Sequence, residues 1–279
     1  MKKSIIRMEF SAPIHVGNKS LSDSEYDLKA DTVFSALCIE SGDISKLVDQ
    51  VKAGQLKISD AFPYIGDYYY IPKPQIYVEQ ESEDYKLFKK IKYITYDTID
   101  AYLAGTLYPL DELKRFILGD SDIRTLVCVD KDPFQVGTFS FKKNAGLYII
   151  VQHEDDYIFE LFERLQYSGI GGKRSSGLGR FSFKIEPCFE FHDDSPNLIL
   201  LNSAMAKDSE LKKTLENANY LLQKRSGFIH QSRYKKQDFY TFKAGSVFRN
   251  KFSGDVFDVG NYKHPVYRYA VPMFMGVKI

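Results

Sequence analysis

Five glycines and several phosphate-binding side chains lie close together in the stretch from Ser168 to Phe181, which reads Ser-Gly-Ile-Gly-Gly-Lys-Arg-Ser-Ser-Gly-Leu-Gly-Arg-Phe. Glycine allows a positive φ and lets another molecule approach the main chain closely. Main-chain N–H groups, hydroxyls and cations are the donors that suit phosphate oxygens. The stretch therefore predicts a polyanion-binding loop, with these candidate ligand-binding residues: Gly169, Gly171, Gly172, Lys173, Arg174, Ser175, Ser176, Gly177, Gly179 and Arg180.

The elements on either side of this loop indicate which kind of polyanion it fits. Residues 156–167 are predicted to form a helix with an apolar stripe, and residues 180–185 alternate as a strand does. A P-loop or a Rossmann turn runs from a strand into a helix whose N-terminus binds the phosphate. Arg174 also follows Lys173, where a P-loop needs Ser or Thr. The setting favours a linear polyanion over a mononucleotide, and a flexible solvated connection is the alternative.

His15 is the histidine whose position suits chemistry, because it lies in a loop after the first predicted strand. A general acid/base that cleaves RNA needs such a side chain near the scissile phosphate, but a structural or RNA-contacting role is the favoured interpretation. His264 is interpreted as a turn residue or an RNA contact. None of the five histidines lies at metal-ligand spacing from another, and no carboxylate cluster argues for a two-metal nuclease. We therefore expect no metal site and no cofactor.

The composition indicates a folded protein of near-neutral charge. The 279 residues are 44% hydrophobic and 15% aromatic, as in globular proteins. With 38 Lys and Arg against 37 Asp and Glu, the net charge is +1, so RNA binding would depend on a local basic groove. The three cysteines are far apart and are predicted to be free thiols, which suits a reducing cytoplasm. No signal peptide or membrane-spanning run is recognisable, so we expect a cytoplasmic protein with no membrane partner.

The elements that position these residues mix strands with helices. Strand patterns are predicted at 4–10, 62–78, 125–129, 134–141, 147–151, 180–185, 255–259 and 266–278, with a loop over 11–24. Helices are predicted at 32–40 after a cap at Asp31, at 43–53, at 98–103 before Gly105, at 110–118 before Gly119, at 156–167 and at 209–217. This order indicates an α+β fold with antiparallel sheets, whose N-terminal half is predicted to end near residue 130.

A basic hairpin is predicted over residues 134–151. Its two strand-like runs flank Lys142-Lys143-Asn144-Ala145-Gly146. Lys142 and Lys143, and the basic residues within 89–92 and 233–236, either form solvated faces or line a groove that follows a phosphate backbone.

Three parts of the chain resemble the RAMP superfamily of CRISPR-associated RNA-binding proteins. The run from Gly169 to Phe181 is similar to their glycine-rich loop, which also follows a helix and enters a strand. The opening Phe-Ser-Ala-Pro-Ile-His-Val-Gly at 10–17, followed by the predicted helix at 31–37, resembles the subunit that caps the crRNA 5′ tag in type III-A (Csm) effector complexes. Lys-Ala-Gly-Ser-Val-Phe at 243–248 and His-Pro-Val-Tyr-Arg at 264–268 also resemble that subunit.

The resemblance implies two ferredoxin-like (RRM-like) domains and a β-hairpin thumb, with an N-terminal domain over 1–130, the thumb over 131–152 and a C-terminal domain carrying the glycine-rich loop over 153–279. It implies a non-catalytic subunit in antiviral defence that binds the crRNA 5′ tag, the large polymerase-like subunit and the backbone RAMP subunit. Thr138 and Phe139 would then wedge between bases, and Ser246 would be a further RNA contact.

Two other functions stay open at this stage. One is a RAMP endoribonuclease that processes precursor crRNA with His15 as general acid/base. The other is a protein-interaction scaffold, which predicts no affinity for RNA. Metal-independent cleavage that is lost in His15→Ala distinguishes the first, and the absence of salt-dependent RNA binding distinguishes the second.

Overall fold

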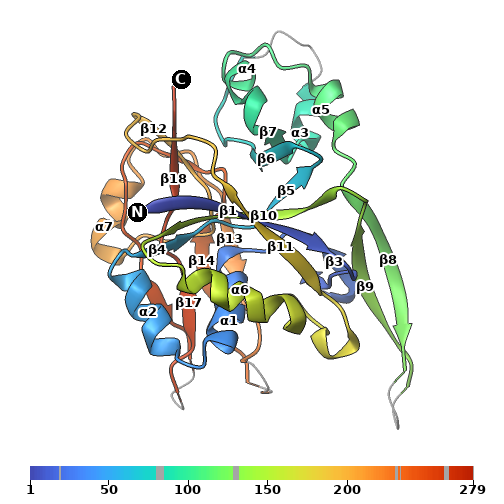
Figure 1. The fold of residues 1–279 in the computed structure, drawn as a ribbon. Helices are drawn as coiled ribbons and strands as arrows, with labels where there is room; N and C mark the ends of the chain where they lie inside the picture. The colour runs from blue at the N-terminus through green and yellow to red at the C-terminus, as the bar shows by residue number, and fades with distance from the viewer. Residues whose placement is uncertain are drawn as a thin grey trace.

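Strand β10 (Ala145–His153) runs through the middle of the main sheet in the computed structural model, which describes residues 1–18, 20–79, 85–127, 132–229, 232, 234–260 and 264–278 (Figure 1). The sheet has the order β11-β1-β10-β5-β6-β7, and β4 also pairs with β10. Its other strands are β1 (Lys2–Phe10), β4 (Leu56–Ile58), β5 (Phe62–Ile65), β6 (Tyr68–Pro72), β7 (Tyr93–Thr95) and β11 (Phe181–Pro187). All of these pairs are antiparallel.

Four of these strands and two helices form a ferredoxin-like unit. In chain order it consists of β1, α1 (Ala30–Ser41), β5, β10, α6 (Tyr157–Ser168) and β11, and its strands lie in the order β11-β1-β10-β5. This is the split βαβ arrangement of ferredoxin-like and RRM-like domains. The helix predicted at 43–53 is confirmed as α2 (Ile44–Lys52). It begins after Asp43, whose side chain caps it by accepting a hydrogen bond from the Lys46 N–H. Helix α1 begins one residue before Asp31, so the prediction that Asp31 caps this helix is wrong.

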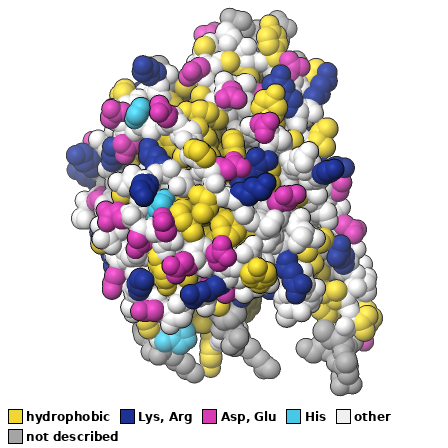
Figure 2. Space-filling view, viewed as in Figure 1, with side chains coloured by type: hydrophobic (Ala, Val, Ile, Leu, Met, Phe, Trp, Pro, Cys, Tyr) yellow, Lys and Arg dark blue, Asp and Glu magenta, His cyan; other side chains and the backbone are white. Residues whose placement is uncertain are grey.

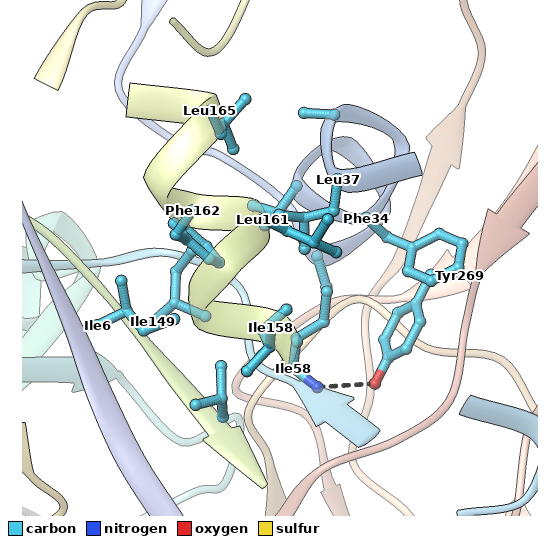
Figure 3. Close-up of a cluster of buried hydrophobic side chains, with 14 of the residues drawn as sticks. Ile6, Phe34, Leu37, Ile58, Ile149, Ile158, Leu161, Phe162, Leu165 and Tyr269 are labelled. Carbon is cyan, nitrogen blue, oxygen red and sulfur yellow. Dashed lines mark hydrogen bonds between the residues drawn. The ribbon is translucent and has the colours of Figure 1, made fainter. Parts of the chain in front are cut away.

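The core explains why β10 occupies the centre of the sheet. Alternate residues of β10 enter two different clusters of buried side chains, because successive side chains of a strand point to opposite faces. On one face the helices α1 and α6 cover the sheet (Figure 3). The labelled side chains there are Ile6, Phe34, Leu37, Ile58, Ile149, Ile158, Leu161, Phe162, Leu165 and Tyr269. The β10 segment is apolar throughout 147–151 because the sheet is buried on both faces at this strand.

An insertion between β5 and β10 covers the other face of the sheet and appears at the top of Figure 1. After β6 it contains α3 (Tyr85–Lys90), β7, the 3₁₀ turn Tyr96–Thr98, α4 (Ile99–Leu103) and α5 (Pro109–Arg115). The short helix before Gly105 is confirmed. The next one ends at Arg115 because Phe116 leaves the helical region with ψ 72°, so Gly119 begins a strand instead of closing a helix.

The projecting hairpin consists of β8 (Gly119–Leu126) and β9 (Phe134–Phe141), which pair from Gly119↔Phe141 to Leu126↔Phe134. The hairpin predicted over 134–151 is therefore wrong, since β10 pairs with β1, β4 and β5. The buried strand predicted at 125–129 is wrong as well, because β8 is polar and mostly exposed; residues 128 and 129 lie outside the described part of the chain. A second small hairpin, β2 (Val16–Asn18) and β3 (Ser20–Glu25), replaces the predicted loop.

The C-terminal unit begins after β11 and has its own antiparallel sheets. The first strand, β12 (Asn197–Leu200), lies between β15 (Val247–Phe248) and β18 (Phe274–Val277). The other elements are α7 (Asp208–Thr214), the hairpin of β13 (Leu222–Arg225) with β14 (Phe239–Phe242), and the hairpin of β16 (Val256–Asp258) with β17 (Tyr267–Tyr269). The predicted α+β class with antiparallel sheets is thus confirmed.

The pairing of β11 with β1 does not fit the predicted division at residues 130 and 152. Strand β10, helix α6 and β11 complete the sheet that β1 begins, so the glycine-rich loop before β11 belongs to the N-terminal unit. The sequence near residue 130 contains no sign that β1 pairs with β11, because the paired residues are about 180 positions apart. Figure 2 shows Lys and Arg side chains interspersed with Asp and Glu over one face, in keeping with the net charge of +1. In the part of the chain that is described, no helix is long and apolar enough to span a bilayer.

Candidate nucleic-acid interface

The glycine-rich loop begins where α6 ends and folds back on itself before β11. The Gly169 N–H donates to the Leu165 carbonyl at 2.8 Å, which closes the helix. The Ile170 N–H donates to the Gly179 carbonyl at 2.9 Å, which brings the two ends of the loop together. The loop thus leaves the helix and enters the strand as a closed unit, in the setting that the sequence predicted.

Most glycines of the loop are needed for its contacts with the protein itself. A Cβ at Gly171 would lie 2.7 Å from the His15 carbonyl oxygen, and one at Gly172 would lie 2.6 Å from the His15 ring. At Gly169 and Gly179 it would meet the backbone of the loop's other end. Beside Gly177 there is nothing within 4 Å, and its φ of 82° favours glycine. Of these five glycines, Gly177 alone has open space beside it for a ligand.

The segment after β1 forms the floor beneath the loop. The Gly172 N–H donates to the His15 carbonyl at 2.8 Å, and the Gly179 N–H donates to the Pro13 carbonyl at 2.9 Å. The His15 side chain is 7% exposed, and its Nδ1 lies 2.7 Å from the Gly137 carbonyl of β9. His15 therefore joins the glycine-rich loop to the projecting hairpin.

The polar side chains of the loop lie on a 3₁₀ turn, Arg174–Ser176, that follows Lys173 in the left-handed region. The Lys173 ammonium lies 4.6 Å from the centre of the Phe134 ring. The Arg174 guanidinium donates to the Gly169 carbonyl at 3.3 Å and lies 3.8 Å from a Glu40 carboxylate oxygen. Ser175, Ser176 and Arg180 are exposed.

A groove of about 850 Å³ opens beside this turn, between the loop, helix α1 and the C-terminal unit. Its charged lining comprises five cations and two carboxylates: Lys173, Arg174, Arg225, Lys236, Arg268, Asp31 and Glu40. Ser35 and Ser175 add hydroxyls, and Ile39 and Phe228 add apolar surface. The groove is therefore basic although the whole chain is nearly neutral, and it has the donors that phosphate oxygens accept from.

Asp31 holds two of these arginines in place. The Arg225 guanidinium donates to both carboxylate oxygens of Asp31, at 2.7 and 3.1 Å, and Arg268 donates to one of them. Burial alone would raise the pKa of Asp31, but the charges of Arg225 and Arg268 outweigh it and hold that pKa below its usual range. Since Asp31 belongs to α1 and both arginines belong to the C-terminal unit, this cluster joins the two units at the groove.

The predicted wedge residues of the hairpin are buried. Thr138 is 1% exposed and Phe139 is 6% exposed. The Phe139 ring packs against Tyr26 and Phe141, with centroids 5.1 Å apart in both pairs. Strand β3 covers this face, because Gly137 lets the backbone of Ser22 approach closely. In this structure neither side chain is available for stacking on a base.

The remaining predicted RNA contacts lie outside the groove. Lys142 forms an exposed ion pair of 2.8 Å with Asp120, and Lys143 is exposed beside it. Ser246 is fully buried and its hydroxyl donates to the Lys243 carbonyl at 2.7 Å. His264 is exposed, with Nδ1 3.2 Å from the Pro265 oxygen. The structure thus brings the loop together with α1 and the C-terminal unit, and not with these four side chains.

The predicted contacts did not include Arg225, Arg268 or the buried Asp31, which line the groove. Lys236 belongs to the basic stretch within 233–236, for which a solvated face and a groove lining were both left open. Asp31 is separated from Arg225 by 194 residues and from Arg268 by 237. No spacing rule connects residues that far apart. The available signal was a carboxylate next to the apolar run of a helix, since a carboxylate that becomes buried needs a cationic partner.

Comparisons with known proteins match a family profile in the C-terminal part of the chain and full-length relatives along nearly all of it. The family profile described as CRISPR Csm4 C-terminal domain matches residues 193–277. CRISPR system Cms protein Csm4 of Streptococcus thermophilus is 33% identical over 292 residues, covering 95% of this chain and 96% of the relative. The protein of that name from Mycobacterium tuberculosis (strain CDC 1551 / Oshkosh) is 34% identical over 301 residues, covering 99% and 98%.

Solved structures have the same fold. A chain of the Csm3-Csm4 subcomplex of the type III-A CRISPR-Cas interference complex is 17% identical, with a TM-score of 0.70 and full coverage of both chains. A chain of the Csm1-Csm4 cassette in complex with cA4 is 20% identical, with a TM-score of 0.67, covering 100% of this chain and 99% of that one.

Proposed function

The chain belongs to the Csm4 family of type III-A CRISPR subunits, and on this basis we propose that it binds the 5′ tag of the crRNA within such a complex. The observation that carries the proposal is the basic groove beside the glycine-rich loop. Five cations with two carboxylates give a local positive field on a chain whose net charge is +1. Such a field attracts and holds a phosphate backbone.

The loop has the donors to hold a splayed single strand. Lys173 precedes its 3₁₀ turn and Arg174 begins it, both half-buried, and the exposed hydroxyls of Ser175 and Ser176 follow. Guanidinium and ammonium groups bind phosphates, while hydroxyls reach base edges or 2′-hydroxyls. The hydrogen bonds from Gly172 and Gly179 to residues 13–15 fix the loop in advance, so binding costs less conformational entropy.

We propose two protein partners by analogy with the related structures, which hold other Csm4 chains with Csm3 and with Csm1. The corresponding partners would be the backbone RAMP subunit and the large polymerase-like subunit. With these contacts the chain would cap the RNA and join the signalling subunit to the backbone, in defence against foreign nucleic acid.

The proposed role is non-catalytic. A general acid/base must reach the proton it transfers. The His15 side chain is 7% exposed, and its Nδ1 already bonds to the Gly137 carbonyl. This environment suits a structural histidine better than the endoribonuclease alternative. Incubation of the purified chain with precursor crRNA tests the point, because metal-independent cleavage that disappears in a folded His15→Gln variant would establish the alternative.

RNA binding is tested by replacing Lys173 and Arg174 together with Ala. We expect weaker binding of single-stranded RNA that carries the tag, whose sequence is read from RNA purified with the complex. The slope of log K against log salt should fall by about 1.4, since each phosphate contact with a single strand contributes roughly 0.7. Fluorescence anisotropy at several salt concentrations measures both quantities.

The matched control replaces Lys212 and Lys213 of α7 with Ala, which removes the same charge at two residues that do not line the groove. Equal slopes in both double variants would show that only net charge matters at the loop. A wild-type chain without salt-dependent affinity for the RNA, in isolation and in the assembled complex, would leave the scaffold function as the explanation.

A further inference from the structure

Three cationic side chains of the C-terminal unit line the groove on the side away from the glycine-rich loop. They are Arg225, Lys236 and Arg268, and the carboxylate beside them is Asp31. Glu40 lies 3.8 Å from Arg174, so its charge serves the loop side. Three positive charges therefore share one negative charge on this side of the groove.

The arginines are held in place before any ligand binds. Asp31 accepts two hydrogen bonds from Arg225 and another from Arg268. Arg268 is only 4% exposed, and within the described residues its Nε has no hydrogen-bond partner. A buried guanidinium that is not fully paired is costly. An anion in the groove would lower that cost through its charge.

The environment of Lys236 also favours an anion in the groove. No ion pair joins its ammonium to a carboxylate among the residues whose structure is described. Burial, and then the nearby charge of Arg268, lower its pKa, against an opposing effect of Asp31. The groove therefore contains a partly buried lysine that has no carboxylate of its own among the described residues.

We infer that this side of the groove is a second phosphate subsite, in which Lys236 and Arg225 hold a phosphodiester of the strand that the glycine-rich loop also binds. This inference rests on the proposed function and adds to it the path of the strand, across the groove from the loop to the C-terminal unit. Arg268 and Asp31 are positioning residues, because they set the place and the charge of Arg225.

A nucleic acid fits the groove better than an acidic peptide does. Phe228, 59% exposed, and Ile39, 40% exposed, line it together with the cations. Exposed aromatic surface beside a basic track is the combination that binds single strands, because a base stacks while its phosphate is paired. A peptide rich in carboxylates would use the cations and leave the Phe228 ring in water.

The test replaces Lys236 with Met, which keeps the aliphatic stem and removes the charge. We expect the affinity for single-stranded tag RNA to fall about fivefold and the salt slope to fall by about 0.7, one phosphate contact. Lys224→Met is the matched control, since Lys224 lies on β13, is exposed and pairs with Asp238 outside the groove. That control should retain the wild-type slope.

A footprint on the wild-type complex provides a second readout that needs no variant. An amine-acylating reagent should modify Lys236 in the RNA-free protein, and bound RNA should protect it while Lys224 stays reactive. The inference is overturned if Lys236→Met keeps the wild-type affinity and salt slope, or if bound RNA does not protect Lys236. In that case the proposed function still stands if changing Lys173 and Arg174 weakens RNA binding. If the chain shows no salt-dependent RNA binding, the subsite and the proposed function are both overturned. If polyglutamate competes as strongly as RNA of equal charge, the subsite alone is overturned.

Discussion

Asp31 shows how much one side chain can do in this protein. Its carboxylate receives Arg225 and Arg268, and thereby ties helix α1 to the C-terminal unit and fixes the charge of the groove. Buried ion pairs of this kind add little net stability compared with apolar packing, but removing one partner is costly.

We expect Asp31→Ala to lower the free energy of unfolding by about 3–5 kcal/mol, because two guanidinium groups lose their carboxylate. Asp43→Ala, which removes the cap of α2, should cost about 1 kcal/mol and serves as the matched Asp→Ala control. Urea denaturation measures both, and equal losses in the two variants would contradict the role given to Asp31.

The contribution of Asp31 to stability depends on pH, and the sign of this dependence follows from its lowered pKa. The folded-state pKa of Asp31 is lowered, so its stabilising effect is present above the unfolded pKa of about 3.9 and disappears as the pH falls through the lower folded value. Asp60 acts in the opposite direction, since burial raises its pKa. Asp31→Asn should therefore lose less stability than wild type when the pH falls below about 4.

The loop shows what could be predicted at this scale and what could not. Its residues and its place between a helix and a strand were predicted, because glycine density and periodicity are local properties. The contacts of Gly171 and Gly172 with His15 were not, because they join positions more than 150 residues apart. The prediction was that these glycines make room for a ligand. Instead, all of them except Gly177 make room for other parts of the protein.

At the level of elements, the hairpin of β8 and β9 differs most from the prediction. Two apolar runs on either side of a basic turn suggested pairing of 134–141 with 147–151. The second run is apolar throughout and belongs in the middle of a sheet with cores on both faces, whereas the polar strand β8 suits an exposed partner. Burial on two faces therefore decided the pairing over proximity in the chain.

Phe139 tests the hairpin's interior. We expect Phe139→Ala to lower the free energy of unfolding by about 3–5 kcal/mol, because its ring packs with Ile14, Leu118 and Ala145. Ile123→Ala, at a position 55% exposed on β8, should change stability by less than about 0.5 kcal/mol. Thermal unfolding measures both. If Phe139→Ala were as stable as wild type and bound RNA less tightly, the ring would have to act as a wedge between bases.

At the scale of the whole molecule, the two units share both a core and a polar network. Val256, Tyr269 and Val271 belong to the cluster beneath α1 and α6. Figure 3 shows Tyr269 in this cluster. The Ile58 N–H donates to the Tyr269 hydroxyl at 2.9 Å, and Asp60 accepts from the Ser203 N–H and hydroxyl at 2.9 and 3.0 Å. The groove therefore lies between parts that are held together, and its width is set by the fold.

This shared interior predicts cooperative unfolding. We expect the full chain to unfold in one calorimetric transition, with a van't Hoff enthalpy equal to the calorimetric one. Asp31→Ala should lower the transition temperature without splitting the peak. Two separated transitions in the wild-type chain would show that the units unfold independently and that the contacts between them are weak.

The pairing of β1 also has a consequence for the chain while it is being made. Its neighbours, β10 and β11, lie about 140 and 180 residues further along. At a synthesis rate of roughly 5–20 residues per second, β1 waits about 10–40 s before its second neighbour leaves the ribosome. During that time Ile5, Ile6 and Met8 belong to a strand that is at first unpaired and then an edge strand beside β10, and such a strand is prone to aggregate. Lys2, Lys3, Arg7 and Glu9 place charges along this strand, and charges of this kind oppose pairing with other chains until the sheet can close.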